Sequence, residues 1–473
     1  MPTPPAFHYR PPSGWMNDPN GLVFHDGEYH LYYQHHPHST DFGPTHWGHA
    51  VSNDLVSWSD LPIALHPDER GHIYSGSVVE DQAGDAGLGH GALIAAFTHF
   101  TPTSQTQSIA GSTDRGRTFR SHPGNPVLAQ PPGMVDFRDP KVVRFGGPDD
   151  GHWVMILAAG DHARLYASAD LVTWTYTSSF VGAPDPGDGI WETPDLFVLP
   201  VDDSDERRWV LTGGVIVEGT GGTNGMRYWV GQFDGRTFTP DAPGSPRWVD
   251  HGADFYAAQS WSHVPDGRRI WIAWMSNWAY ARRVPAVGWR GQMTVPRELR
   301  LTRVDSAITL AQRPVRELLG RFDPPRRIRA RAVLEEGAGL IRFGASSAAD
   351  SACGIELRWQ SGEVRVVRDA AAGTLVVDRT AAADVGLGET YHTVRHAPLH
   401  PTGERVEVEV LVDRWSLEVF ADRGQVVLTD LVAPVSETAA VEVAAIGPLA
   451  GPIEICPFRC DDANHRGQQS AVA

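Results

Sequence analysis

Cysteine and lysine are nearly absent from this chain of 473 residues. The three cysteines, Cys353, Cys456 and Cys460, form an odd and sparse set, which excludes a disulfide framework. Lys141 is the only lysine, and arginine supplies the other basic side chains. We interpret this preference as a mark of gene base composition, without functional meaning.

Long apolar runs and basic clusters are missing as well. No run approaches the length of a membrane-spanning helix. No cationic segment followed by an apolar stretch opens the chain, as a signal peptide would. The net charge of −17 argues against nucleic acids and anionic membranes as partners. We therefore expect a protein that is cytoplasmic, or secreted with a signal outside this sequence, and the sequence leaves its oligomeric state open.

The composition changes along the chain. The first 300 residues hold 14 of the 16 tryptophans, whereas all three cysteines come later. The length also exceeds that of one ordinary core. We predict a catalytic domain over 1–302, a linker over 303–322, a second domain over 323–462 and a frayed tail over 463–473.

Strand patterns dominate both parts of the chain. Residues 21–33 predict a hairpin with its turn at 25–28, and residues 153–157, 209–211 and 270–274 predict apolar strands. Residues 405–412 and 417–421 alternate apolar and polar side chains, as in the strands of a β-sandwich. The sequence therefore predicts an all-β protein.

A loose repeat points to the arrangement of the first domain. A Ser-x-Asp turn followed by an aromatic residue begins at Ser52, Ser112 and Ser168, and fades to Asp234. The copies are about 60 residues apart, which suits one four-stranded blade of a β-propeller each. Loops from different blades meet at the central channel, so distant residues can converge there.

Three carboxylates stand in stiff, proline-containing motifs. They are Asp18 in Trp-Met-Asn-Asp-Pro-Asn-Gly, Asp139 in Arg-Asp-Pro and Glu192 in Trp-Glu-Thr-Pro. Because proline favours extended geometry in its predecessor, we expect these acids on preset, extended backbones. Cleaving a sugar acetal needs a nucleophile, a proton donor and a group that holds the substrate.

Together, these motifs resemble those of glycoside hydrolase family 32, the β-fructofuranosidases, whose motifs read WMNDPNG, RDP and ECP. Further similar segments are residues 46–50, 74–77, 254–258, 275–278 and 413–420. The resemblance implies a five-bladed β-propeller followed by a β-sandwich. It also implies a retaining hydrolase that removes terminal β-D-fructofuranosyl units from levan- or inulin-type fructans, fructo-oligosaccharides and sucrose, without a cofactor.

The resemblance assigns a role to each acid, and each has a simpler alternative. Asp18 would be the nucleophile, although Asp before Pro often only caps a turn. Glu192 would be the acid/base, with a pKa raised by apolar walls and nearby carboxylates, although most Glu residues are surface groups. Asp139 would accept hydrogen bonds from sugar hydroxyls, with Arg138 beside it, unless the two form a merely structural pair.

Pocket residues are also assigned by motif position. Amides suit sugar hydroxyls and aromatic faces suit the C–H surfaces of the ring, while core packing is the alternative for each aromatic residue. The candidates are Trp15, Asn17, Gln34, Phe42, Trp47, Tyr74, Ser75, Tyr256 and Trp278.

Two positions depart from the family pattern. Thr193 stands where the family has Cys after the acid/base, and its hydroxyl could hydrogen-bond to Glu192. Phe42 stands where members commonly have a Trp that lines the fructose pocket, so the wall keeps its apolar face but loses the indole N–H.

Other polar clusters suggest binding sites less strongly. A group of histidines could suggest a metal site: His35, His36, His38, His46 and His49. His46 and His49 would face opposite sides of a strand, however, so they could not share a metal. Residues 202–206 lack the spacing of a calcium loop, and the glycine-rich stretch 219–225 has no lysine or helix to hold a phosphate. We expect no metal.

Two other functions compete with hydrolysis. A levan fructotransferase of the same fold would pass the fructosyl group to a sugar hydroxyl and form a cyclic difructose. A non-catalytic fructan-binding propeller would not need all three acids.

Overall fold

The structure is a computed structural model, and it describes residues 3–147, 150–182, 189–216, 224–242, 244, 246–304, 306–346, 351–360, 362–399, 403–432 and 440–459. Strands dominate, and α1 (Arg316–Leu319) is the only α-helix among these residues. The all-β prediction is confirmed. No helix in the described part is long and apolar enough to cross a membrane. The expected tail at 463–473, and all but the last two residues of 219–225, lie outside the described residues.

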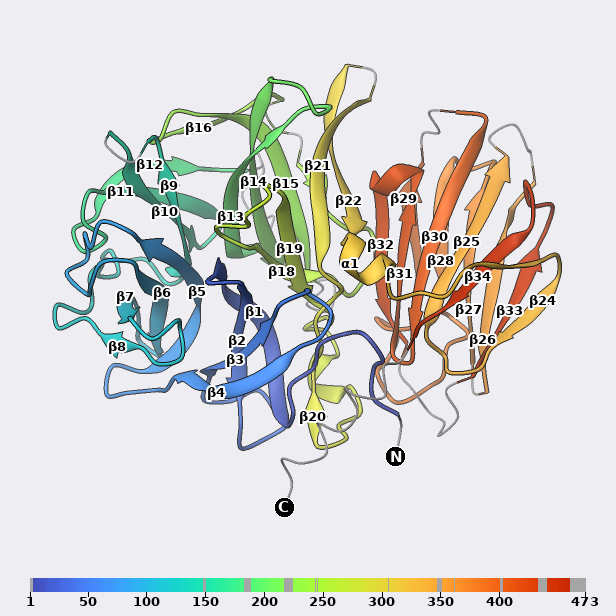
Figure 1. Cartoon of the computed structure of the whole chain (residues 1–473), viewed down its shortest axis with the longest axis horizontal. Helices are drawn as coiled ribbons and strands as arrows, with labels where there is room; N and C mark the ends of the chain where they lie inside the picture. The colour runs from blue at the N-terminus through green and yellow to red at the C-terminus, as the bar shows by residue number, and fades with distance from the viewer. Residues whose placement is uncertain are drawn as a thin grey trace.

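Five sheets succeed one another along the first two thirds of the chain (Figure 1). The first comprises β1 (Gly14–His25), β2 (Glu28–His36), β3 (His46–Ser52) and β4 (Ser59–Leu65), with β20 (Trp289–Arg290) beside β1. The second comprises β5 (His72–Asp81), β6 (Ala92–Thr101), β7 (Ser104–Ser112) and β8 (Arg120–Ser121). The third comprises β9 (Arg138–Phe145), β10 (His152–Ala159), β11 (His162–Ser168) and β12 (Thr175–Phe180). The fourth comprises β13 (Ile190–Pro200), β14 (Arg207–Ile216), β15 (Asn224–Phe233), β16 (Phe238–Pro240) and β17 (Arg247–Trp248). The fifth comprises β18 (Tyr256–Ser260), β19 (Arg269–Trp274), β21 (Arg297–Val304) and β22 (Ala307–Pro314).

The first strands of these sheets form a closed ring. β1 contacts β5, β5 contacts β9, β9 contacts β13, β13 contacts β18, and β18 returns to β1. Residues near the same end of these five strands therefore meet around one axis, although β1 and β18 lie more than 200 residues apart in the chain.

The Ser-x-Asp repeat lies at equivalent places in three sheets. Ser52, Ser112 and Ser168 end the third strand of their sheets, and each hydroxyl donates to the aspartate two residues later, at 2.7–3.0 Å. The next residue has a positive φ of 62–63° in all three turns. These segments are the outer hairpins, as the repeat predicted.

The predicted strands agree with the observed ones. The hairpin at 21–33 is β1 and β2, and residues 153–157, 209–211 and 270–274 lie in β10, β14 and β19. The expected linker at 303–322 differs, because β22 occupies residues 307–314 and pairs with β21 along its length. Residues 307–314 therefore complete the fifth sheet.

Two six-stranded sheets follow and share one core, as in β-sandwiches. One has the order β23 (Arg326–Ile328), β34 (Ile453–Pro457), β25 (Gly339–Ser346), β30 (Arg405–Asp413), β31 (Ser416–Ala421) and β32 (Val426–Leu431). The other has the order β24 (Arg331–Leu334), β33 (Val441–Ile446), β26 (Cys353–Trp359), β27 (Gly362–Asp369), β28 (Thr374–Asp378) and β29 (Val394–Pro398). The strands predicted at 405–412 and 417–421 are β30 and β31.

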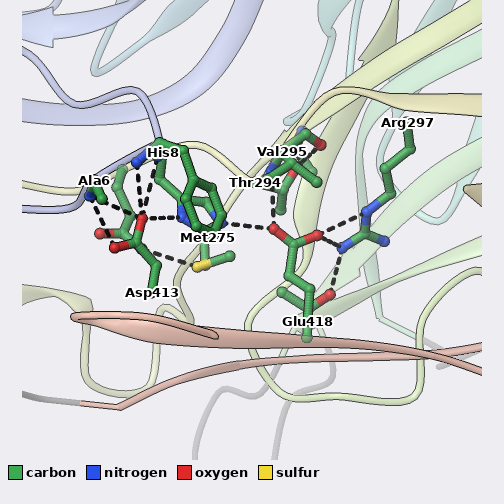
Figure 2. Close-up of polar contacts among 12 residues, drawn as sticks. Ala6, His8, Met275, Thr294, Val295, Arg297, Asp413 and Glu418 are labelled. Atoms are coloured by element: carbon green, nitrogen blue, oxygen red, sulfur yellow. Dashed lines mark hydrogen bonds and ion pairs between the residues drawn. The ribbon is translucent and has the colours of Figure 1, made fainter. Parts of the chain in front are cut away.

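A buried ionic network joins this region to the N-terminal segment and the fifth sheet (Figure 2). His8 donates from Nδ1 to Asp413 and from Nε2 to Glu418, both at 2.8 Å, and no side chain of the three is exposed. Glu418 also accepts the Val295 amide at 2.9 Å and the Arg297 guanidinium. Burial lowers the pKa of His8, but the two carboxylates outweigh it and raise the pKa to about 9.

A second buried network lies between the fifth sheet and the sandwich. Arg379 donates to Asp254 at 2.6 Å and to the Tyr280 hydroxyl at 2.8 Å, and it lies 3.2 Å from Asp430. Asp254 thus holds the two parts of the chain together.

Candidate active site

Each of the five strands of the ring is interrupted once near the candidate acids or their neighbours. Each carries a register shift of the β-bulge type, which bends a strand and re-aims its side chains. The shifts lie between Met16 and Pro19 on β1, Ile73 and Gly76 on β5, Arg138 and Lys141 on β9, Glu192 and Asp195 on β13, and Tyr256 and Gln259 on β18. Asp18, Ser75, Asp139, Glu192 and Tyr256 all lie at these bulges. The ring therefore brings the three predicted acids together.

The backbone at three bulges is left-handed. Asp139, Thr193 and Ala257 have φ values of 64°, 44° and 56°. The residues before Pro140 and Pro194 were expected to be extended, and that expectation is wrong. Tertiary contacts override the local preference, since the Asp139 amide donates to Thr98 Oγ1 at 3.0 Å and the Thr193 amide to Asp139 Oδ2 at 2.9 Å. Such strain persists where the surroundings hold it, commonly at functional sites.

Asp18 is held by two neighbouring side chains. Ser75 Oγ donates to Oδ2 at 2.6 Å, and Asn17 Nδ2 donates to Oδ1 at 3.0 Å. Trp15 Nε1 fixes the Asn17 amide through its oxygen at 2.8 Å. Burial raises the pKa of Asp18 to about 6, and the charge of Glu192 adds to the rise against the two hydrogen bonds.

Glu192 is held by groups from two other strands. Arg138 Nη2 donates to Oε1 at 3.2 Å, and the Tyr256 hydroxyl donates to Oε2 at 2.7 Å. Arg138 also binds Asp136 and Gln105, which fix the guanidinium. The Glu192 side chain is 20% exposed, so substrate can reach it.

Asp139 is the most buried of the three acids, with a side chain 5% exposed. Burial raises its pKa to about 8, Arg138 opposes this rise, and the charges of Glu192 and Asp18 reinforce it. Arg138 Nε lies 4.0 Å from Asp139 Oδ2 but shares its other nitrogens among three side chains. Asp139 is therefore one of several acidic and polar partners of Arg138.

Aromatic rings form one wall of the site. Trp15 stacks on Trp278 with centroids 6.0 Å apart, and Phe42 packs edge-on against both. The Trp278 amide donates to Asn224 Oδ1 at 2.7 Å. Phe42 thus packs among these rings, and the Arg282 guanidinium lies 5.5 Å from the centre of its ring.

Three pocket candidates have supporting positions. Trp47 is fully buried in a core cluster, and its indole donates to the Tyr74 carbonyl at 3.0 Å. The core-packing alternative thus describes Trp47. Tyr74 is half-buried and stacks on Phe100 at 4.2 Å. Gln34 is buried, and its Nε2 donates to the side-chain oxygen of Asn20 at 3.0 Å.

The Thr193 hydroxyl does not contact Glu192. Its oxygen is buried without a hydrogen-bond partner among the described residues, and only the Thr193 backbone touches Asp139. The expected hydrogen bond from Thr193 to the acid/base is therefore wrong, because the hydroxyl oxygen is buried away from any such partner.

One residue beside the acids had no motif that would have revealed it. Asn20, Thr193 and Gln259 lie together with Ser75 and Asp139. Gln259 donates to the carbonyls of Thr193 and Pro194, both at 3.1 Å. Asn20 lies in the first motif and Thr193 in the third, so of these residues only Gln259 had no signal in the sequence.

Among the described residues, no group of three or more His, Cys, Asp or Glu side chains could hold a metal ion. His30 and His49 pair with each other at 3.0 Å, and His35 bonds to the Trp15 carbonyl at 2.8 Å. These histidines are parts of the packing.

Clustered carboxylates beside an aromatic wall, in an all-β fold, define a carboxylate-based glycoside hydrolase. Comparison with known proteins specifies the family. Residues 8–314 match the glycosyl hydrolases family 32 N-terminal domain, and residues 324–449 match the family's C-terminal domain. The chain belongs to glycosyl hydrolase family 32 and is a β-fructosidase.

Individual relatives agree with this placement. A levanase of Bacillus subtilis (strain 168) is 40% identical over 462 residues, 93% of this chain and 68% of the relative. An extracellular exo-inulinase of Aspergillus awamori is 35% identical over 93% of this chain and 91% of the relative. The crystal structure of an exo-inulinase from the same fungus has a TM-score of 0.88 at 31% identity, covering 97% and 99% of the two chains. A β-fructofuranosidase of Schwanniomyces occidentalis complexed with fructosyl-erythritol has a TM-score of 0.87 at 27% identity, covering 96% and 97%.

Proposed function

We propose that this chain is a retaining enzyme that removes terminal β-D-fructofuranosyl units from fructans and sucrose. Asp18 is the nucleophile, Glu192 the acid/base, and Asp139 the acceptor of sugar hydroxyl hydrogen bonds. The observation that carries the proposal is the gathering of three acids at the bulges of three strands of the ring, where the charge of Glu192 raises the pKa of both Asp18 and Asp139.

The contacts suit a two-step reaction. Asp18 attacks C2 of the fructosyl unit while Glu192 gives its proton to the departing glycosidic oxygen. Water then attacks C2, gives a proton to Glu192 and releases Asp18. Ser75 and Asn17 hold Asp18 for the attack, and Arg138 and Tyr256 orient Glu192.

Asp139 supports the reaction through binding. Burial and the charges of Glu192 and Asp18 raise its pKa, and its carboxyl oxygens can accept hydrogen bonds from sugar hydroxyls. Such bonds lower the barrier when they strengthen in the transition state.

The names of the relatives favour polymeric fructans as substrates. Because a polymer cannot enter a cell, we propose that the protein acts outside it, as the Aspergillus awamori exo-inulinase does. We also propose that the five sheets are the blades of a β-propeller, which agrees with the ring of first strands. The domain boundary would then lie after β22, within residues 315–323.

Conservative replacement of the acids tests the catalytic roles. Asp18→Asn and Glu192→Gln should each lower kcat on sucrose and levan by several orders of magnitude while the melting temperature does not fall. Asp203→Asn is the matched control, because this side chain is 77% exposed on a distant turn. Near-wild-type turnover in either active-site variant would remove the assignment.

Stereochemistry and products test the reaction class. We predict a separation of about 5–5.5 Å between the carboxyl groups of Asp18 and Glu192, and β-fructofuranose as the first product seen by NMR. An inverted first product would contradict a covalent intermediate. Free fructose from levan supports the proposal, whereas a cyclic difructose would identify a fructotransferase.

A further inference from the structure

The only lysine of the chain contacts two other strands that carry residues of the site. Lys141 is two residues beyond Asp139 on β9, and its side chain is 4% exposed. Nζ lies 3.1 Å from Asp195 Oδ2 and donates to the Ser260 carbonyl at 2.8 Å. Asp195 is fully buried, and the same oxygen accepts the Ser260 amide at 2.7 Å. The earlier interpretation, that the scarcity of lysine has no functional meaning, does not cover Lys141, because its buried contacts set it apart.

The three partners come from three different sheets. Lys141 is on β9, Asp195 on β13 and Ser260 on β18, and backbone ladders do not join these strands. Each partner follows a left-handed bulge residue by two or three positions, namely Asp139, Thr193 and Ala257. The ion pair therefore links the three strands close to the bulge in each of them.

We propose that Lys141 and Asp195 are a positioning pair that sets the distances among Asp139, Glu192 and Tyr256. This inference rests on the proposed function, since it assigns the pair's effect to the reaction of those acids. The pair touches no substrate and acts only through the three strands.

Energetics favour positioning over simple stabilisation. A buried ion pair can often be replaced by apolar side chains of similar volume without loss of stability, whereas removing one partner leaves an uncompensated charge. Catalysis depends far more sharply on geometry, because a displacement of about 1 Å can cost roughly 100-fold in rate. The pair should therefore matter more for turnover than for folding.

The decisive variant replaces both partners, Lys141→Met with Asp195→Leu. We expect a folded protein whose kcat on sucrose falls by roughly 10- to 100-fold, with KM changed much less. Because the distances between the acids also set their mutual charge effects, the acid limb of the pH profile should move. Asp195→Asn keeps an oxygen for Lys141 and Ser260, so it should retain more activity than the double variant.

The matched control is the pair Arg342–Glu409 on the sandwich, whose atoms are 2.7 Å apart. Arg342→Met with Glu409→Leu should leave kcat and the pH profile unchanged. Wild-type kcat and pH profile in the Lys141/Asp195 double variant would overturn the proposal. If that variant does not fold, Asp195→Asn is the test. A wild-type kcat together with a wild-type pH profile in Asp195→Asn would then overturn the proposal.

Asp18→Asn, measured in parallel, separates the two levels of inference. If Asp18→Asn is inactive while the double variant works normally, only the positioning role fails. If Asp18→Asn turns over sucrose normally, the proposed function itself fails.

Discussion

His8 should make the stability of this protein depend on pH in the alkaline range. It lies fully buried between Asp413 and Glu418, and its pKa rises from 6.5 to about 9 (Figure 2). A histidine with a raised folded-state pKa contributes stability that is complete below 6.5 and is lost as the pH rises through about 9. At 1.36 kcal/mol for each pH unit, the loss is about 3 kcal/mol.

The perturbation is His8→Gln, which keeps a polar side chain but cannot carry charge. Folding should survive, because Asp413 retains the amides of Ala6 and Phe7, and Glu418 retains Arg297. The assay is urea unfolding at intervals from pH 6 to 9.5. The wild type should lose about 3 kcal/mol more than the variant across this range.

His90→Gln is the matched control, since His90 is exposed in a loop. Its stability should follow the wild-type curve. Parallel curves for the wild type and His8→Gln would refute the reasoning, because they would show that His8 binds no extra proton on folding. At acid pH the sign reverses: the partners Asp413 and Glu418 have lowered pKa values despite burial, so their contribution is lost as the pH falls below about 4.

Four further predictions concern the site. Because the proposed nucleophile Asp18 must be ionised, kcat/KM should fall below about pH 6. Ser75→Ala removes a hydrogen bond that lowers the pKa of Asp18, so it should move the acid limb to higher pH in a pH–rate series. Tyr256→Phe removes a hydrogen bond to Glu192 and should lower kcat about tenfold or more in steady-state assays, and an unchanged kcat would show that the bond is dispensable. Thr193→Cys removes a buried hydroxyl that has no partner among the described residues, so the free energy of unfolding should rise by about 1 kcal/mol. A shift of the basic limb in this variant would contradict the structure, because it would show that Thr193 acts on Glu192. EDTA should leave turnover unchanged, and a loss that one divalent ion restores would overturn carboxylate-only chemistry.

The sequence by itself predicted the strands and the candidate acids of the site. Alternating side chains placed β30 and β31, and the turn residues at 25–28 placed the first hairpin, because both signals are local. The three acids were identifiable because each lies in a short motif with its own neighbours. Asp18, Asp139 and Glu192 were therefore predicted together without knowledge of their distances.

Only the tertiary structure decided how these residues act on one another. The left-handed backbone of Asp139 and Thr193 opposes the preference imposed by the following prolines, and hydrogen bonds from other strands hold it. Trp47 could have faced substrate or core, and packing placed it in the core.

The partners of Lys141 and His8 lie 54 and more than 400 residues away in the chain, so no local pattern could indicate them. A sequence motif identifies only groups that are close together in the chain. The closure of the ring and the docking of the sandwich decide which distant groups meet, because burial and charge depend on every strand that surrounds a site.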